Sequence, residues 1–221
     1  MNINKIIIPR SILVLLSLSV ILNIARILIF HSVYLVYLLW NIILALLPFI
    51  VSSTLLYYDK NEKLPTPMLL ICGLIWLLLF PNAPYIVTDL MHMTHGNSII
   101  VLFDTVILFS SAWTGLVIGM YSLSHIDQII KRRYSIKASK IVIPFIILFT
   151  SFGMYLGRFL RFNSWDVFIN PISFGRNVWN VFYNPTQYIN AYIFTLVFFF
   201  FIYMSYGVWR YSNSNIPTQS T

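Results

Sequence analysis

The chain has 221 residues, of which 59% are hydrophobic and 9% are charged. Soluble domains carry roughly a quarter charged residues, so this composition excludes a water-soluble globular domain and indicates an integral membrane protein. The net charge of +8 predicts no nucleic-acid partner, because Lys and Arg in a multi-pass protein mainly report orientation.

Six segments are long and apolar enough to cross a bilayer, which takes about 20 residues in a helix. In chain order they are residues 8–30, 33–57, 68–87, 99–123, 141–162 and 189–209. The only cysteine, Cys72, lies in the third segment, so no intramolecular disulfide can form. The predicted fold class is all-α: a polytopic membrane helix bundle in one transmembrane domain (1–211), followed by a short polar tail (212–221).

The distribution of Lys and Arg predicts the orientation of this bundle. With the N-terminus inside, ten of the fourteen basic residues lie on the inner side. The outer side and its helix ends hold the other four: Arg26, Arg158, Arg161 and Arg176. This positive-inside bias predicts that both termini are cytoplasmic and that the lipid bilayer is the main partner.

Residues 163–188, between the fifth and sixth segments, are too polar to span but rich in aromatic side chains. This composition suits an outer segment that lies on or dips into the membrane interface. An ordinary aromatic loop packed over the helix ends is equally compatible with it.

Polar residues in the spans gather in the predicted outer half of the membrane. Charges at that depth favour a cavity or an ion pair, and we expect Asp104 to pair with Arg158 or Arg161. Such a pair either lines a ligand pocket or only locks the bundle, and both interpretations stay open. For Arg26 we expect snorkelling toward the outer interface.

Pro81 and Pro84 interrupt the third span. Proline removes a backbone donor and disfavours helix in the preceding residue, so a kink or unwound turn is predicted here. Broken backbone at this depth is tolerated where it is buried in protein or lines a cavity. If the broken backbone lines a cavity, Asn82 faces the outward pocket. If it is buried in protein, neighbouring helices satisfy the backbone groups freed at the kink.

Asp89, His92 and His95 follow at intervals of three residues. Two histidines and a carboxylate are a minimal set of metal ligands, but hydrated groups at a pocket mouth explain the spacing better. We therefore predict no metal and no cofactor.

Ser111, Gly115 and Gly119 recur every four residues. Small residues at this spacing let membrane helices pack closely, either within the chain or in a helix-mediated oligomer.

The chain resembles the domain-of-unknown-function family 1361 in three strings. They are WLLLFPNAPYIVTDL (76–90), FDTVILFSSAWTGLVIGMYSL (103–123) and YLGRFLRFNSWDVFINP (155–171). The resemblance covers about residues 35–205 and implies a multi-pass protein of the bacterial cytoplasmic membrane. It brings no activity with it.

Three functions are compatible with these residues. The first is binding or processing of an anionic lipid-linked or small substrate in an outward-facing pocket. The second is a small permease with a proton- or ion-coupled site, and the third is a non-catalytic structural or envelope-assembly component. No catalytic residue is assigned. The candidate pocket residues are Asn82, Tyr85, Asp89, Asp104, Arg158, Arg161, Asn163 and Asp166.

Overall fold

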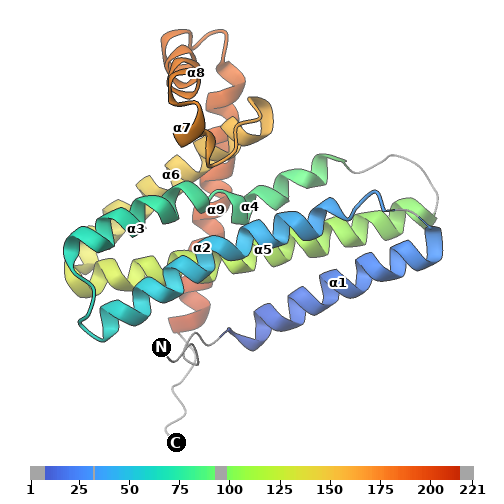
Figure 1. The fold of residues 1–221 in the computed structure, drawn as a ribbon, viewed down its shortest axis with the longest axis horizontal. Coiled ribbons are helices and arrows are strands. Elements are labelled where there is room, and N and C mark those ends of the chain that lie inside the picture. Colours follow the sequence, from blue (N-terminus) through green and yellow to red (C-terminus); the bar gives the residue numbers. More distant parts are fainter. Residues whose placement is uncertain (1–7, 32, 93–98, 215–221) are drawn as a thin grey trace, which may run out of the picture. The chain divides into compact units, whose positions relative to one another are not determined.

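The computed structural model describes residues 8–31, 33–92 and 99–214, and these residues contain helices but no strand. The chain divides into two compact units, Met1–Arg132 and Arg133–Thr221 (Figure 1). The first unit contains α1 (Arg10–Phe30), α2 (Tyr37–Lys60), α3 (Thr66–Leu79), α4 (Asn82–Tyr85), the 3-10 helix η1 (Ile86–His92) and α5 (Ile99–Arg133), whose last residue belongs to the second unit. The second contains α6 (Ile136–Phe159), α7 (Asp166–Ile169), α8 (Pro171–Tyr183) and α9 (Ile189–Ser214).

Six helical segments in the described part of the chain are long and apolar enough to cross a membrane. Five are the helices α1, α2, α5, α6 and α9, and the sixth, Thr66–Met91, combines α3, α4 and η1. The prediction of an all-α, six-span membrane protein is therefore confirmed. The orientation of the termini and the single domain over residues 1–211 stay predictions.

Helix α1 shows why this fold requires a bilayer. Its buried residues are Ile12, Ser19, Asn23 and Arg26, three of them polar, whereas most of its Leu, Ile and Val side chains are exposed. Polar side chains inside and apolar side chains outside are the pattern of a helix in lipid, where small and polar residues mediate helix contacts.

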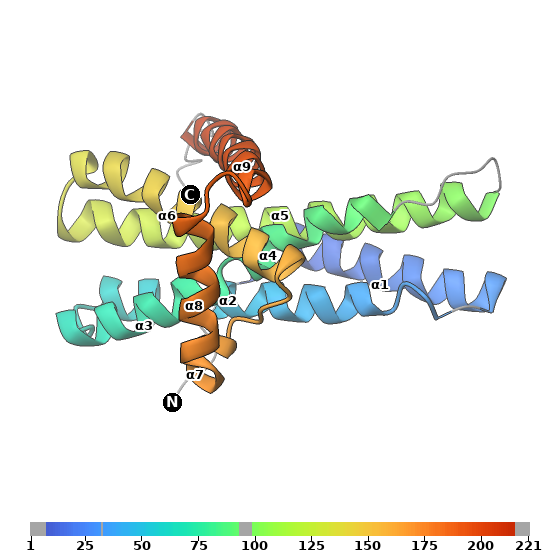
Figure 2. The same ribbon diagram turned by 90° about the horizontal axis from the view of Figure 1, so that it is seen from above.

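Polar contacts join α1 to α5 along their length. Ser11 Oγ lies 2.9 Å from the Tyr121 hydroxyl, and Ser19 Oγ lies 3.1 Å from Thr114 Oγ1. Residues later in α1 contact residues earlier in α5, so the two helices are antiparallel. Figure 2 shows α1 and α2 running beside α5 within this unit.

The third span is broken at the predicted prolines. Helix α3 ends at Leu79, and the Ala83 N–H donates to the Phe80 carbonyl (3.1 Å), the carbonyl that the proline nitrogen at position 84 cannot serve. The chain then continues as α4 and η1. The predicted interruption is thus a short helical turn with its own hydrogen bonds.

Gly115 and Gly119 let this broken segment approach α5. A Cβ atom added to Gly115 would lie 2.6 Å from the Ala83 carbonyl oxygen and 2.8 Å from Ile86 Cδ1. A Cβ atom on Gly119 would lie 3.3 Å from the Ala83 Cβ. The close-packing role predicted for these glycines is confirmed, and the element that packs on them is α4 with the start of η1.

In the second unit, one face of α8 packs on the end of α6 and the start of α9. Val181 forms an apolar cluster with Tyr155, Leu156 and Ala191, and the Tyr192 hydroxyl donates to the Val181 carbonyl at 3.0 Å. Proline at the first position of α8 supplies a favourable helix start, because its missing N–H would have no intrahelical partner there. The segment predicted as either an interfacial stretch or a loop is therefore helical over most of its length.

Candidate functional site

Asp104 pairs with Arg26. The Arg26 Nε and Nη2 atoms donate to the two carboxylate oxygens at 2.5 and 2.9 Å, and the residues are 5% and 8% exposed. This corrects two expectations: Arg26 does not snorkel, and the partner found for Asp104 is neither Arg158 nor Arg161. Two parallel N–H···O bonds make this the stronger, geometrically specific form of ion pair.

The sequence of α1 contains a pattern that could have indicated this pair, formed by Ser19, Asn23 and Arg26. They follow at i, i+4 and i+7, which places them on one helix face. That face meets α5 in the structure, with Ser19 against Thr114 and Arg26 against Asp104. A polar stripe on an otherwise apolar helix is thus a better indicator of a buried contact than the position of Arg26 near the helix end.

Asp89 is the second buried carboxylate at the same end of this unit. It is 2% exposed and accepts a hydrogen bond from Asn41 Nδ2 at 2.8 Å, which joins η1 to α2. Asn82 and Tyr85 lie just before it on α4 and are half-buried. Asp89 therefore lies near the start of α2, and Asp104 lies near the start of α5. Asn82 and Tyr85 belong to α4, whose Ala83 packs on α5 at Gly115 and Gly119, near the middle of that helix.

The weak metal hypothesis involved Asp89, His92 and His95. His95 and the side chain of His92 lie outside the described residues. Among the side chains that are described, no group of three or more His, Cys, Asp or Glu residues is arranged to hold a metal ion.

The second-unit candidates gather where α6 ends. Arg158 is half-buried in the last turn of α6, and Arg161 is exposed two residues after the helix. Arg161 has a φ angle of +57°, in the left-handed region, and the following Phe162 N–H donates to the Leu156 carbonyl at 3.2 Å. A left-handed residue that ends a helix is usually Gly, so an arginine here is unusual.

Asn163 and Asp166 form one local turn. The Asn163 backbone N–H donates to Asp166 Oδ2 at 2.6 Å, and the Asp166 N–H donates back to the Asn163 carbonyl at 3.0 Å. Asp166 also begins α7, where a carboxylate is favoured by the helix dipole. The Asp166 carboxylate is therefore explained by its role in this turn. The Asn163 side chain is exposed and follows Arg158 and Arg161 closely in the sequence.

Helices α7 and α8 expose a continuous set of large apolar side chains. On α8, Ile172, Trp179 and Tyr183 follow at i, i+7 and i+11 and are each at least two-thirds exposed. Phe168 and Ile169 of α7 are similarly exposed. Because Val181 on the opposite face is fully buried, α8 has two apolar faces, one packed on its own unit and one open.

A polar network joining α2, α3 and α5 was not expected from the sequence. Ser122 Oγ accepts from Trp76 Nε1 at 2.8 Å, donates to the Pro48 carbonyl at 3.0 Å, and lies 3.0 Å from Ser52 Oγ. His125 Nδ1 lies 3.2 Å from the same Ser52 oxygen. A single serine inside an apolar segment does not predict such a contact, because it has several possible neighbours.

The helices and their buried polar contacts define the class as a multi-pass integral membrane protein. A family model described as "Protein of unknown function (DUF1361)" matches residues 40–209, and the chain belongs to this family. No curated protein and no solved structure matches the chain.

Proposed function

We propose that this protein binds an anionic, phosphate-bearing lipid or lipid-linked molecule at the end of its second unit where α6 stops and α7 and α8 follow. Arg158, Arg161 and Asn163 would contact the phosphate. The proposed location is the outer face of a bacterial cytoplasmic membrane, as the charge distribution and the family resemblance suggest.

One observation carries the proposal: an open apolar helix face adjoins exposed basic residues. Ile172, Trp179 and Tyr183 on α8 are exposed, and Arg176 lies on the same face, four residues after Ile172. A helix that combines an apolar face with basic residues binds the boundary between headgroups and acyl chains. Arginine is also well suited to phosphate, which it can hold with two parallel hydrogen bonds.

The first-unit candidates favour the non-catalytic structural role, which was the third function considered above. Asp104 is neutralised by Arg26, and Asp89 is held by Asn41. A permease site at the broken third span is less favoured, because Ala83 and Ile86 of that segment pack directly against α5 at Gly115. For the first unit we therefore propose a scaffold.

The test is photo-crosslinking of the full-length protein in nanodiscs. The probe is phosphatidylglycerol with a diazirine in its acyl chain, and crosslinks are mapped by peptide mass spectrometry. We expect crosslinks in the 158–183 region. The double variant Arg158→Gln with Arg161→Gln should lower their yield by about tenfold, the effect of losing one or two charge-assisted hydrogen bonds.

A zwitterionic probe, phosphatidylcholine with the same diazirine chain, is the headgroup control. Its yield should be low and equal in the wild type and the double variant. Equal crosslinking of the two probes to the wild type would show that the region contacts lipid without selecting an anionic headgroup, and the proposed function would be wrong.

A further inference from the structure

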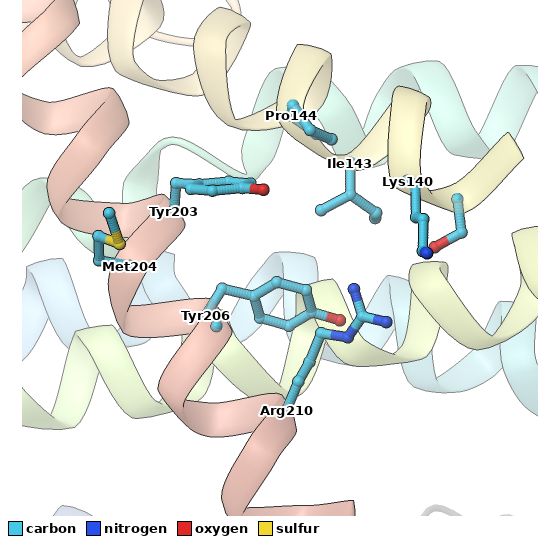
Figure 3. A pocket seen from close by; sticks show the side chains of 9 residues that line it. Lys140, Ile143, Pro144, Tyr203, Met204, Tyr206 and Arg210 are labelled. Carbon is cyan, nitrogen blue, oxygen red and sulfur yellow. The ribbon is translucent and has the colours of Figure 1, made fainter. Parts of the chain in front are cut away.

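A pocket of about 310 Å³ lies between the first half of α6 and the second half of α9, within the second unit. Figure 3 shows the side chains of Lys140 and Arg210 reaching the same space from the two helices, beside the rings of Tyr203 and Tyr206. This volume falls within the range of small-molecule sites. The pocket contains none of the residues of the proposed outward site.

The two basic residues lie at equivalent depths. Lys140 is the fifth residue of α6, and Arg210 is the fifth from the end of α9. At 1.5 Å per residue, each is about 6 Å inside its helix end. In the predicted orientation, this is the cytoplasmic interface, where headgroup phosphates lie.

The arrangement around Arg210 holds its guanidinium close to the pocket wall. Its Cζ atom lies 5.9 Å from the centre of the Tyr206 ring, and Tyr206 is itself 2% exposed. A cation over an aromatic face is attracted by the negative potential of the ring. Arg210 is thereby held near the pocket rather than extended into water.

The rest of the lining suits the glycerol and acyl part of a lipid. Ile143, Pro144 and Met204 are apolar, and Ser139 and the tyrosines add hydroxyl groups. Pro144 has no N–H to donate to the Lys140 carbonyl one turn earlier. The Lys140 carbonyl thus adds a polar backbone group at the level of the basic residues, whereas Ile143 and Met204 are apolar.

We propose that this pocket binds the phosphate group of an anionic phospholipid, with Lys140 and Arg210 as the phosphate ligands. Basic pockets between transmembrane helices on the cytoplasmic side are a recurrent form of anionic-lipid site. The inference is independent of the proposed outward site, since the two sites share no residue.

Gly207 offers a direct test, because it lines the pocket and a Cβ atom added there would meet nothing within 4 Å. Gly207→Leu should therefore fill the pocket without a clash. Bound lipids are counted by native mass spectrometry of the full-length protein in detergent with phosphatidylglycerol. We expect Gly207→Leu to retain one phosphatidylglycerol fewer than the wild type.

Gly73→Leu is the matched control. Gly73 lies on α3, outside the pocket and outside the proposed outward site, and a Cβ atom there also meets nothing within 4 Å. This variant should retain the wild-type number of lipids. If Gly207→Leu retains the same number with the same affinity as Gly73→Leu, no lipid occupies the pocket and the proposal is wrong.

Charge and lipid source are tested in two further arms. Lys140→Gln with Arg210→Gln should weaken phosphatidylglycerol binding at this site about tenfold, whereas Lys137→Gln with Arg10→Gln, which removes two charges outside the pocket, should not. Phosphatidylcholine of the same chains should bind weakly. Displacement of the lipid by millimolar inorganic phosphate, or equal binding of both lipids, would overturn the assignment to an anionic phospholipid.

Discussion

The first unit carries seven basic and five acidic residues, whereas the second unit carries seven basic residues and one acidic residue, Asp166. In the first unit, carboxylates meet side chains of the same unit: Asp104 meets Arg26, Asp127 meets Lys131, and Asp59 lies 3.7 Å from Arg132. In the second unit, Asp166 accepts a backbone N–H of its own turn. The basic residues of the second unit are Arg133, Lys137, Lys140, Arg158, Arg161, Arg176 and Arg210.

This difference bears on the two proposed roles, a scaffold for the first unit and lipid binding for the second. A charge buried in a bilayer is costly unless it is paired or hydrated, and the first unit meets this requirement with its own carboxylates. The second unit has one carboxylate for seven cations. This excess of positive charge would favour the anionic lipids that are proposed as its ligands.

The largest effect is expected from breaking the Arg26–Asp104 pair. Asp104→Asn leaves a buried arginine without its carboxylate, and removing one partner of a buried pair costs about 3–5 kcal/mol. We expect a decrease of this size in the free energy of unfolding, measured by titration from mild detergent into sodium dodecyl sulfate. Lipid crosslinking by the second unit should persist under conditions where the variant is folded.

The control is the double variant Arg26→Met with Asp104→Leu. Replacing both partners by apolar residues is often neutral or stabilising, so most of the lost stability should return. A double variant that is stable yet lacks a cellular phenotype of the wild type would instead give this pair a functional role and contradict the scaffold interpretation.

Gly115→Ala tests the packing of the broken third span and should have an intermediate effect. Its new Cβ atom would lie 2.6 Å from a backbone oxygen, Ala83 O, which cannot rotate away. Overpacking of this kind costs about 1–3 kcal/mol, which the same unfolding titration would detect.

Gly73→Ala, in the same unit, provides the comparison. A Cβ atom at Gly73 meets nothing within 4 Å, and replacing a glycine inside a helix by alanine is favourable by about 0.5–1 kcal/mol. The two variants should therefore change stability in opposite directions. Equal effects would show that α4 does not pack on α5 at this position.

The sequence predicted the six spans, the interruption at Pro81 and the close approach at Gly115, because each depends on local chemistry: apolar length, a missing N–H and a missing side chain. It did not predict the partner of Asp104. Several arginines were available near the same membrane face, and choosing among them requires the helix neighbours, which hydropathy does not encode. The pocket at Lys140 and Arg210 was missed for a related reason, since its residues lie on two spans and were counted only as orientation signals.

The smallest expected effect on stability concerns Arg161. Its side chain is proposed to bind lipid, but its left-handed backbone conformation favours glycine. A residue with a side chain is disfavoured by about 1–2 kcal/mol in the left-handed conformation, and Arg161 has a φ angle of +57°. Arg161→Gly should therefore raise stability by about 1 kcal/mol or less, because glycine also has a more flexible unfolded state. Arg161→Gln keeps the backbone cost and should leave stability nearly unchanged, yet both variants should lose phosphatidylglycerol crosslinks in the 158–183 region. If instead both variants destabilise the protein and leave crosslinking intact, the arginine supports the fold. The contrast between a first unit with internal ion pairs and a second unit proposed to bind lipid would then fail at this end of the second unit.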